Sequence, residues 1–114
     1  DLVALRHAIQ VNGVTKLIMM KGDVLDTFPI VRACVAYEIN GRRTDRFPYD
    51  AAAVNIRPVY EDLPGWQTDL TGAKSAEDFP ENFRSYIRYL EEKLGVPVAI
   101  VSVGPDRLQT ICLD

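Results

Sequence analysis

The sequence predicts an α/β fold: part of a mostly parallel sheet with flanking helices and an inserted β-hairpin. Two stretches, residues 2–20 and 80–102, each run from a helical pattern into a short apolar strand. Between them, Asn40-Gly41 joins two strand-like stretches and is the strongest two-residue hairpin signal. Helices that alternate with buried strands are typical of parallel sheets, whose ligand sites lie just beyond the carboxyl ends of the strands.

The first helix is predicted over residues 2–12, where apolar residues recur at helical spacing. Asn12-Gly13 ends the pattern, because glycine tolerates the left-handed conformation that closes a helix. Residues 15–20 form a short apolar run bounded by glycines. This run predicts a strand that is buried on both faces, as in a parallel sheet.

The second helix is predicted to begin at Ser75–Asp78, a Ser-x-x-Asp pattern, with Pro80 in its first turn and Gly95 at its end. Its apolar residues recur every three or four positions, so one face is expected to be buried: Phe79, Phe83, Ile87, Leu90 and Leu94. Residues 97–102 then form a continuous apolar strand, and residues 109–113 form a last short strand.

The predicted hairpin begins with an alternating strand that places five residues on one face: Val31, Ala33, Val35, Tyr37 and Ile39. A return strand is expected over residues 42–47, ended by Pro48. Residues 54–63 hold a further strand, which Pro58 confines in part to a sheet edge. Trp66 follows a Pro-Gly turn and is expected to be a packing anchor.

Composition favours one globular domain, residues 1–114, without an internal boundary: 47% of the residues are hydrophobic and 25% are charged. The net charge of −3 argues against nucleic-acid binding, and Arg42, Arg43 and Arg46 are interpreted as a solvated face. No apolar run approaches the ~20 residues that a membrane helix needs, so we expect no membrane contact and a cytoplasmic location. The chain starts at Asp1 rather than at Met, which we interpret as the start of a segment cut from a longer protein.

Cysteine and histidine give no metal site by spacing. Cys34 and Cys112 each lie in an apolar strand-like run, so both are expected to be buried free thiols. His7 has no second histidine with which to bind a metal, and its position in a helical pattern favours a packing or surface role.

Two polar strings follow apolar strands and form a candidate guanine site: Lys21-Gly22-Asp23 and Ser102-Val103-Gly104. A carboxylate such as that of Asp23 can accept two hydrogen bonds from the ring N–H and the exocyclic amine of guanine, an edge that adenine lacks. The stem of Lys21 can lie along the base, and a Ser-x-Gly turn offers a hydroxyl and backbone N–H groups to the guanine carbonyl. Taken without their context, both strings are equally consistent with ordinary solvated turns.

The order of several further segments resembles the carboxyl-terminal part of the adenylosuccinate synthetases, over nearly the whole chain. These segments are Leu5-Arg6-His7-Ala8, Asn12-Gly13, Lys21-Gly22-Asp23-Val24-Leu25-Asp26, Cys34-Val35-Ala36-Tyr37, Pro58-Val59-Tyr60-Glu61, Leu63-Pro64-Gly65-Trp66, Gly95-Val96-Pro97 and Ser102-Val103-Gly104-Pro105-Asp106-Arg107. The resemblance implies that both polar strings contact guanine. One departure is Gly22, where the family often carries leucine.

The resemblance also implies what the parent protein does. Members of this family are magnesium-dependent ligases with a P-loop NTPase-like fold, and they join IMP to L-aspartate in AMP synthesis, with GTP as the phosphoryl donor, as homodimers. Their catalytic residues and magnesium ligands precede this segment, and this sequence has no GxxxxGK-like string. We therefore expect no catalytic residue and no metal ligand here, and no ligase activity from this segment alone. The alternative is a non-enzymatic α+β binding or interaction module that binds no nucleotide.

Overall fold

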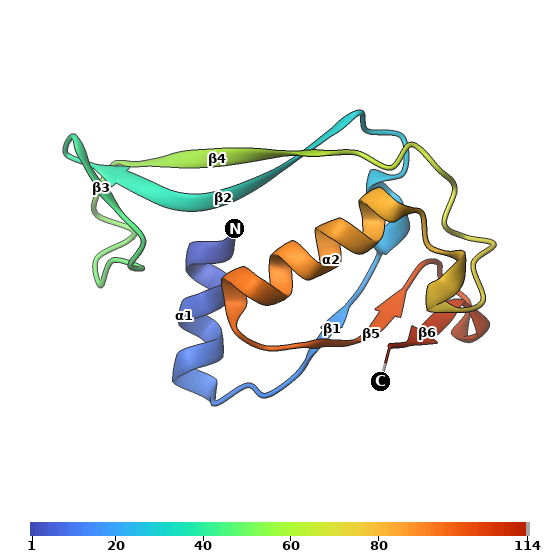
Figure 1. Ribbon diagram of the computed structural model, residues 1–114. Helices are drawn as coiled ribbons and strands as arrows, with labels where there is room; N and C mark the ends of the chain where they lie inside the picture. The colour runs from blue at the N-terminus through green and yellow to red at the C-terminus, as the bar shows by residue number, and fades with distance from the viewer. Residues whose placement is uncertain (114) are drawn as a thin grey trace.

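The computed structural model describes residues 1–113 (Figure 1). Two α-helices, six strands and three short 3₁₀ turns follow one another along the chain: α1 (Leu2–Asn12), β1 (Leu17–Met19), η1 (Gly22–Leu25), β2 (Ile30–Ile39), β3 (Arg42–Thr44), β4 (Ile56–Pro64), η2 (Ala76–Asp78), α2 (Glu81–Leu94), β5 (Val98–Ser102), η3 (Arg107–Gln109) and β6 (Thr110–Cys112). The helices and strands confirm the predicted α/β class.

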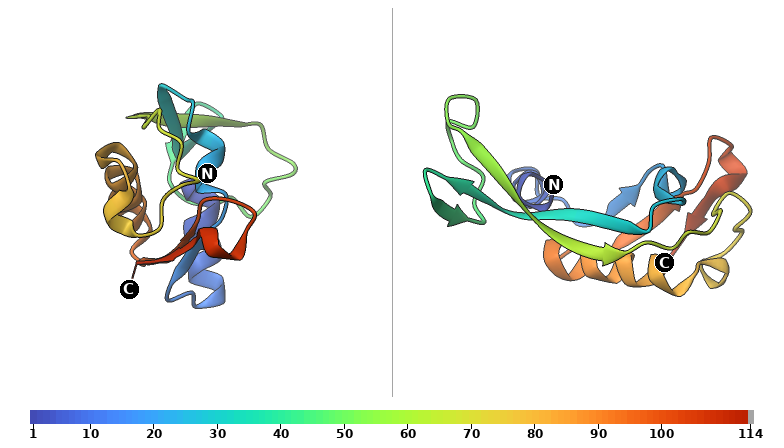
Figure 2. Two further views of the ribbon diagram at one scale, coloured as in Figure 1. Left: turned by 90° about the vertical axis from the view of Figure 1, so that its right-hand side faces the viewer. Right: turned by 90° about the horizontal axis from the view of Figure 1, so that it is seen from above.

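The strands form two separate sheets. In the first, with the order β1-β5-β6, β1 runs parallel to β5, and β6 runs antiparallel to β5. In the second, with the order β3-β2-β4, all pairing is antiparallel, and this is the inserted hairpin. Helix α2 lies between the long β2–β4 ribbon and the smaller sheet (Figure 1), and β3 lies at the end of the ribbon farthest from β6 (Figure 2).

Helix α1 has the limits that the sequence predicts. At its start, the Asp1 carboxylate accepts hydrogen bonds from the N–H groups of Val3 at 3.0 Å and Ala4 at 3.1 Å. At its end, Gly13 is left-handed, with φ of 63°. Both caps satisfy backbone groups that a helix leaves without intrahelical partners.

Helix α2 begins later than predicted. The capping box of Ser75 and Asp78 is present, but it closes the short turn η2. Phe79 then has extended backbone, with ψ of 132°, and Pro80 is the residue before the first helical one. The prediction was wrong here because a residue that precedes proline is disfavoured in helical conformation. The predicted end is confirmed, since Gly95 is left-handed with φ of 74°.

The hairpin turn is confirmed, but the alternation along β2 is not. Asn40 and Gly41 both have positive φ, as a type I′ turn requires. Strand β3 ends at Thr44 rather than at Phe47, and Pro58 is tolerated because β4 has a single neighbour.

A bulge explains the broken alternation of β2. Cys34 pairs with Tyr60 and Ala36 pairs with Val59, which leaves one extra residue, Val35. Tyr37 therefore packs in the same cluster as Cys34, and not with Ala33 as predicted. A single extra residue reverses the faces that follow it, because side chains alternate with a period of two.

Two burial predictions are also wrong. Strand β1 is at a sheet edge, and its Ile18 is 60% exposed, because only the face that carries Leu17 and Met19 packs against the core. Cys112 is exposed, because its neighbour Ile111 takes the inward face of β6. The thiol of Cys34 is buried and free, as expected.

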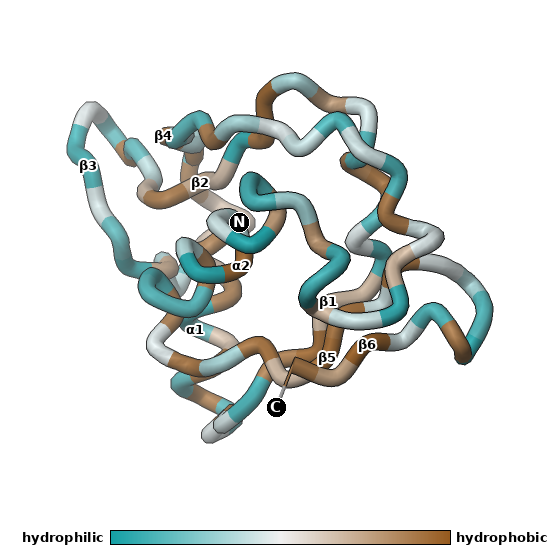
Figure 3. The backbone as a smooth tube through the Cα atoms, turned by 45° about the vertical axis from the view of Figure 1, so that its right-hand side comes forward, coloured by the Kyte–Doolittle hydropathy of each residue, from teal (hydrophilic) through white to brown (hydrophobic). Residues whose placement is uncertain are grey.

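The core joins both sheets to α2. Four residues of the predicted helix stripe, Phe83, Ile87, Leu90 and Leu94, are buried, together with Phe79 just before the helix. The hydrophobic stretches of β5 and β6 are visible in Figure 3. Trp66 is 5% exposed and packs in this core, which confirms its anchoring role. Neither α1 nor α2 is long and apolar enough to cross a membrane.

Candidate functional site

The two predicted strings lie side by side at the carboxyl ends of β1 and β5 in the smaller sheet. The last parallel pair, Met19 with Val101, brings the ends of β1 and β5 side by side. Just beyond it lies an open hollow of about 410 Å³, lined by Met20, Lys21, Asp23, Val24, Ser102, Gly104, Pro105, Asp106, Arg107 and Thr110. Four of the six predicted site residues line this hollow, and the other two, Gly22 and Val103, are buried beside it.

The first string forms a turn with an unusual backbone. Lys21 is left-handed, with φ of 56°, and its carbonyl accepts a hydrogen bond from the N–H of Val24. A lysine in this region costs on the order of 1–3 kcal/mol, and such conformations are concentrated at functional sites. Asp23 follows inside η1 and is partly buried. Within residues 1–113 its carboxylate has no hydrogen-bond or ion-pair partner, so both oxygens are free to accept.

Within the described residues, the second string has one free hydrogen-bond donor, which belongs to its backbone. The Ser102 hydroxyl donates to the carbonyl oxygen of Gly104 at 3.1 Å. The side chain of Val103 is fully buried and its N–H donates to the carbonyl of Gln109 at 2.9 Å. Val103 therefore holds the loop against the core and does not line the hollow. The N–H of Gly104 has no acceptor in the described part of the chain. It is therefore the group of this string that is free to donate.

Both glycines lie where the chain is tightly packed. A methyl group on Gly22 would lie 3.2 Å from Cζ of Phe83 and 3.4 Å from the carbonyl oxygen of Ser102, so the first string lies close to the second. A methyl group on Gly104 would lie 2.0 Å from Oε1 of Gln109. The second position therefore excludes any side chain unless the Gln109 amide moves.

The hollow has the chemistry of a site for a planar, polar ring. Free acceptor oxygens on Asp23 and a free N–H on Gly104 supply hydrogen bonds for a ring edge. Met20, Val24 and Pro105 supply apolar surface for the ring faces. These apolar residues were not among those predicted for the site, and the feature of the sequence that points to them is their position directly beside the two strings.

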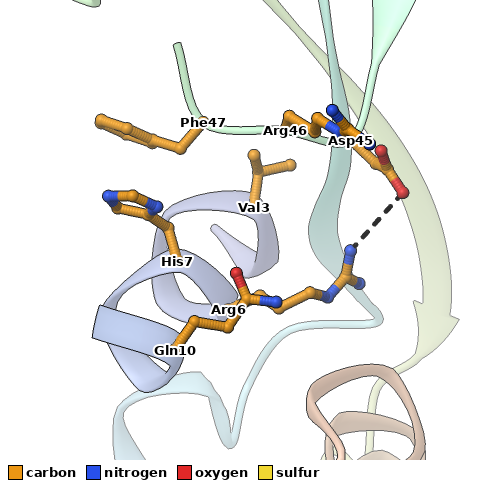
Figure 4. A pocket seen from close by; sticks show the side chains of 7 residues that line it. All are labelled: Val3, Arg6, His7, Gln10, Asp45, Arg46 and Phe47. Atoms are coloured by element: carbon orange, nitrogen blue, oxygen red, sulfur yellow. Dashed lines mark ion pairs between the residues drawn. The ribbon is translucent and has the colours of Figure 1, made fainter. Parts of the chain in front are cut away.

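A larger hollow lies elsewhere, between α1 and the loop that follows β3, with a volume of about 540 Å³ (Figure 4). The imidazole of His7 stacks on the ring of Phe47, with centroids 5.1 Å apart, and Arg6 lies 3.9 Å from Asp45. These contacts agree with the expected packing role of His7. None of the six predicted site residues lines this hollow, and no group of three or more potential metal ligands occurs among residues 1–113.

Comparison with known proteins identifies relatives over almost the whole chain. The model of the adenylosuccinate synthetase family matches residues 1–111. The chain is 61% identical over 111 residues to the adenylosuccinate synthetase of Bacteroides fragilis and 50% identical to that of Christiangramia forsetii. Each match covers 97% of this chain and 26% of the relative, so the chain spans about a quarter of the length of these relatives.

A solved structure has the same fold. The fully ligated adenylosuccinate synthetase from Plasmodium falciparum superposes with a TM-score of 0.91 and 26% sequence identity, over 100% of this chain and 28% of that chain. Family match, sequence identity and fold agree with the order of motifs in the sequence. The chain belongs to the adenylosuccinate synthetase family.

Proposed function

We propose that this chain is the guanine-binding, carboxyl-terminal part of a GTP-dependent ligase that forms adenylosuccinate from IMP and L-aspartate. The observation that carries the proposal is that Asp23, whose carboxylate has no partner among residues 1–113, lines the same hollow as Gly104, whose N–H has no acceptor there. Guanine presents its N–H and amine edge to an acceptor and its carbonyl to a donor, whereas adenine does not present this pair of groups. The family membership supports the ligase reaction.

The proposal divides the work between this segment and the rest of the parent protein. Lys21, Gly22 and Asp23 form one side of the guanine pocket, and Ser102, Val103 and Gly104 form the other. Phosphoryl transfer needs cationic clamps and magnesium around the phosphates, and we assign both, with the catalytic residues, to the parts of the parent outside this segment. The parent is proposed to act as a cytoplasmic homodimer.

The substitution Asp23→Asn in the full-length enzyme tests the guanine assignment. An amide donates where guanine also donates, so the KM for GTP should rise roughly ten- to hundredfold, the cost of losing a charge-assisted bond. Xanthosine triphosphate, which has a carbonyl in place of the guanine amine, should become the better substrate. Asp62→Asn, which removes an exposed carboxylate that pairs with Arg32 on the hairpin, is the matched control. An unchanged preference for GTP over xanthosine triphosphate would show that Asp23 does not select the base and would favour a module that binds no nucleotide.

The isolated 114-residue chain gives a second test. It retains the base contacts and lacks the proposed phosphate contacts, so we expect no ligase activity and a Kd for GTP weaker than about 0.1 mM, or some −5.5 kcal/mol. Isothermal titration measures this constant. A tighter complex would mean that phosphate contacts lie within residues 1–114 and would contradict the proposed division.

A further inference from the structure

We propose that Asp26 and Gln109 are positioning residues that hold the two guanine-contacting loops at a fixed separation, through a strap formed by residues 66–71. This inference rests on the proposed function, since it concerns the same pocket. Neither Asp26 nor Gln109 lines the hollow, so neither is placed to touch a bound base. Their effect on GTP is therefore expected to be indirect.

Asp26 links the strap to the loop that contains Lys21-Gly22-Asp23. One carboxylate oxygen, Oδ1, accepts from the indole Nε1 of Trp66 at 2.7 Å, and the other, Oδ2, accepts from the N–H of Leu70 at 2.7 Å. Both are short bonds to an acidic side chain, the stronger class of hydrogen bond in proteins. The N–H of Asp26 itself donates to the carbonyl of Asp23 at 3.1 Å. Asp26 thus bonds to the strap through its side chain and closes the turn that contains Asp23 through its backbone N–H.

Two residues of the strap are packed in the core. Trp66 and Leu70 are 5% and 1% exposed, and both belong to the core cluster around Phe83. The indole lies 4.8 Å from the ring of Phe83, the same ring that packs against Gly22. At the far end, Asp69 accepts from both the N–H and the hydroxyl of Thr71, and these bonds hold the pKa of its carboxyl below the usual value. The strap therefore fixes the distance between its anchors.

Gln109 links the strap to the loop that contains Ser102-Val103-Gly104. Its side-chain Nε2 donates to the carbonyl of Thr71 at 3.2 Å, while Oε1 accepts from the N–H of Asp106 at 3.0 Å. Its own carbonyl accepts from the N–H of Val103 at 2.9 Å. One residue thus joins the end of the strap to both sides of the loop that carries Gly104.

The sheet alone does not set the loop separation. Parallel pairing between β1 and β5 ends at Met19 and Val101, so both loops extend past the last paired residues. Beyond that point, the loops are connected by the close approach of Gly22 to Ser102 and by the path through the strap. A guanine that must satisfy Asp23 and Gly104 at once depends on their spacing, because hydrogen bonds weaken steeply with misalignment.

The test compares Asp26→Asn, Trp66→Phe and Gln109→Glu in the full-length enzyme. Asp26→Asn places a donor against an N–H group, Trp66→Phe removes the indole donor together with one of the two fused rings, and Gln109→Glu cannot donate to Thr71. We expect each to raise the KM for GTP, by about tenfold for Asp26→Asn and by about threefold for the milder two, a fraction of the loss of a direct contact. The KM for IMP and kcat should stay within about twofold, because neither the strap nor the hollow is proposed to contact IMP or to hold a catalytic residue.

Asp78→Asn is the matched control. Asp78 also accepts from two backbone N–H groups, those of Lys74 at 2.9 Å and Ser75 at 3.1 Å, but it lies outside the strap and the hollow. It should lower the thermal unfolding temperature without changing the KM for GTP. The inference is overturned if the strap variants behave like Asp78→Asn, or if they raise the KM for IMP as much as that for GTP.

Asp23→Asn separates the two proposals. If it shifts the preference toward xanthosine triphosphate while the strap variants leave the KM for GTP unchanged, the guanine pocket stands and the positioning role fails. If it has no effect on base preference, the guanine pocket itself fails. Should Asp26→Asn not fold, Trp66→Phe and Gln109→Glu decide the outcome, since both leave the Asp26 carboxylate in place and Gln109→Glu keeps the shape of the side chain it replaces.

Discussion

The contact between Gly104 and Gln109 makes a quantitative prediction for Gly104→Ala. The new methyl carbon would lie 2.0 Å from Oε1, 2.3 Å from Cδ and 2.6 Å from Nε2 of Gln109. Ordinary contacts between such atoms exceed about 3.4 Å, so the amide group must leave. Because it is the far end of a flexible side chain, it can move without displacing the backbone.

The cost is therefore that of the bonds which the amide gives up. It accepts from the N–H of Asp106 at 3.0 Å and donates to the carbonyl of Thr71 at 3.2 Å. A neutral hydrogen bond contributes about 0.5–1.5 kcal/mol net, so Gly104→Ala should destabilise the folded state by about 1–3 kcal/mol. The KM for GTP should rise with it, since the two lost bonds of Gln109 hold the loop that carries the N–H of residue 104, the proposed donor to guanine.

A double-mutant cycle with Gln109→Ala isolates this cause. Once Gln109 is shortened, the obstructing amide is absent, so Gly104→Ala should cost almost nothing more in stability. The four proteins are compared by their thermal unfolding midpoints. Additive effects, with Gly104→Ala equally costly in both backgrounds, would refute the reasoning and would locate the strain in the backbone of residue 104.

Three further predictions concern other parts of the molecule. Leu70→Ala removes a side chain that is 1% exposed and should destabilise the fold by about 2–5 kcal/mol, measurable as a lower unfolding midpoint. Burial, and then the hydrogen bond to Glu61, raise the pKa of Tyr89. The neutral hydroxyl of Tyr89 therefore contributes fully to stability below about pH 10, and this contribution is lost as the pH rises further. Tyr89→Phe should flatten the alkaline fall in stability. An unchanged fall would exclude Tyr89 as its source. Ile18, 60% exposed on the open edge of β1, should promote association of the isolated chain, and sedimentation should show Ile18→Lys to be monomeric at concentrations where the original chain is not.

The features that the sequence predicted correctly depend on local chemistry. Gly13 and Gly95 end their helices, and Asn40-Gly41 forms the hairpin turn, because few residues accept positive φ. The periodic stripe of α2 is buried because the helical period places its members on one side. Each of these depends on a few neighbouring residues, which is what a single sequence displays.

The features that were missed depend on distant partners. The extra residue in β2 is defined only by its pairing with β4, so the strand by itself gives no sign of the bulge at Val35. The exposure of Cys112 similarly depends on which face of β6 meets α2. The capping box at Ser75 was recognised correctly but was assigned to the wrong element, because only Phe79 and Pro80 separate η2 from the helix that follows.

The candidate site combines both kinds of information. The groups proposed to contact guanine, on Asp23 and Gly104, follow apolar strands and could be selected from the sequence. The contacts that set their separation could not, since Asp26 bonds Trp66 and Gln109 bonds Thr71 across long stretches of chain. Hydrogen-bond chemistry therefore predicts a preference for guanine, and the proposed strap accounts for how two loops from opposite ends of the chain would be held together around it. The proposed strap predicts that base specificity can be weakened by substitution of residues that are not placed to touch the base.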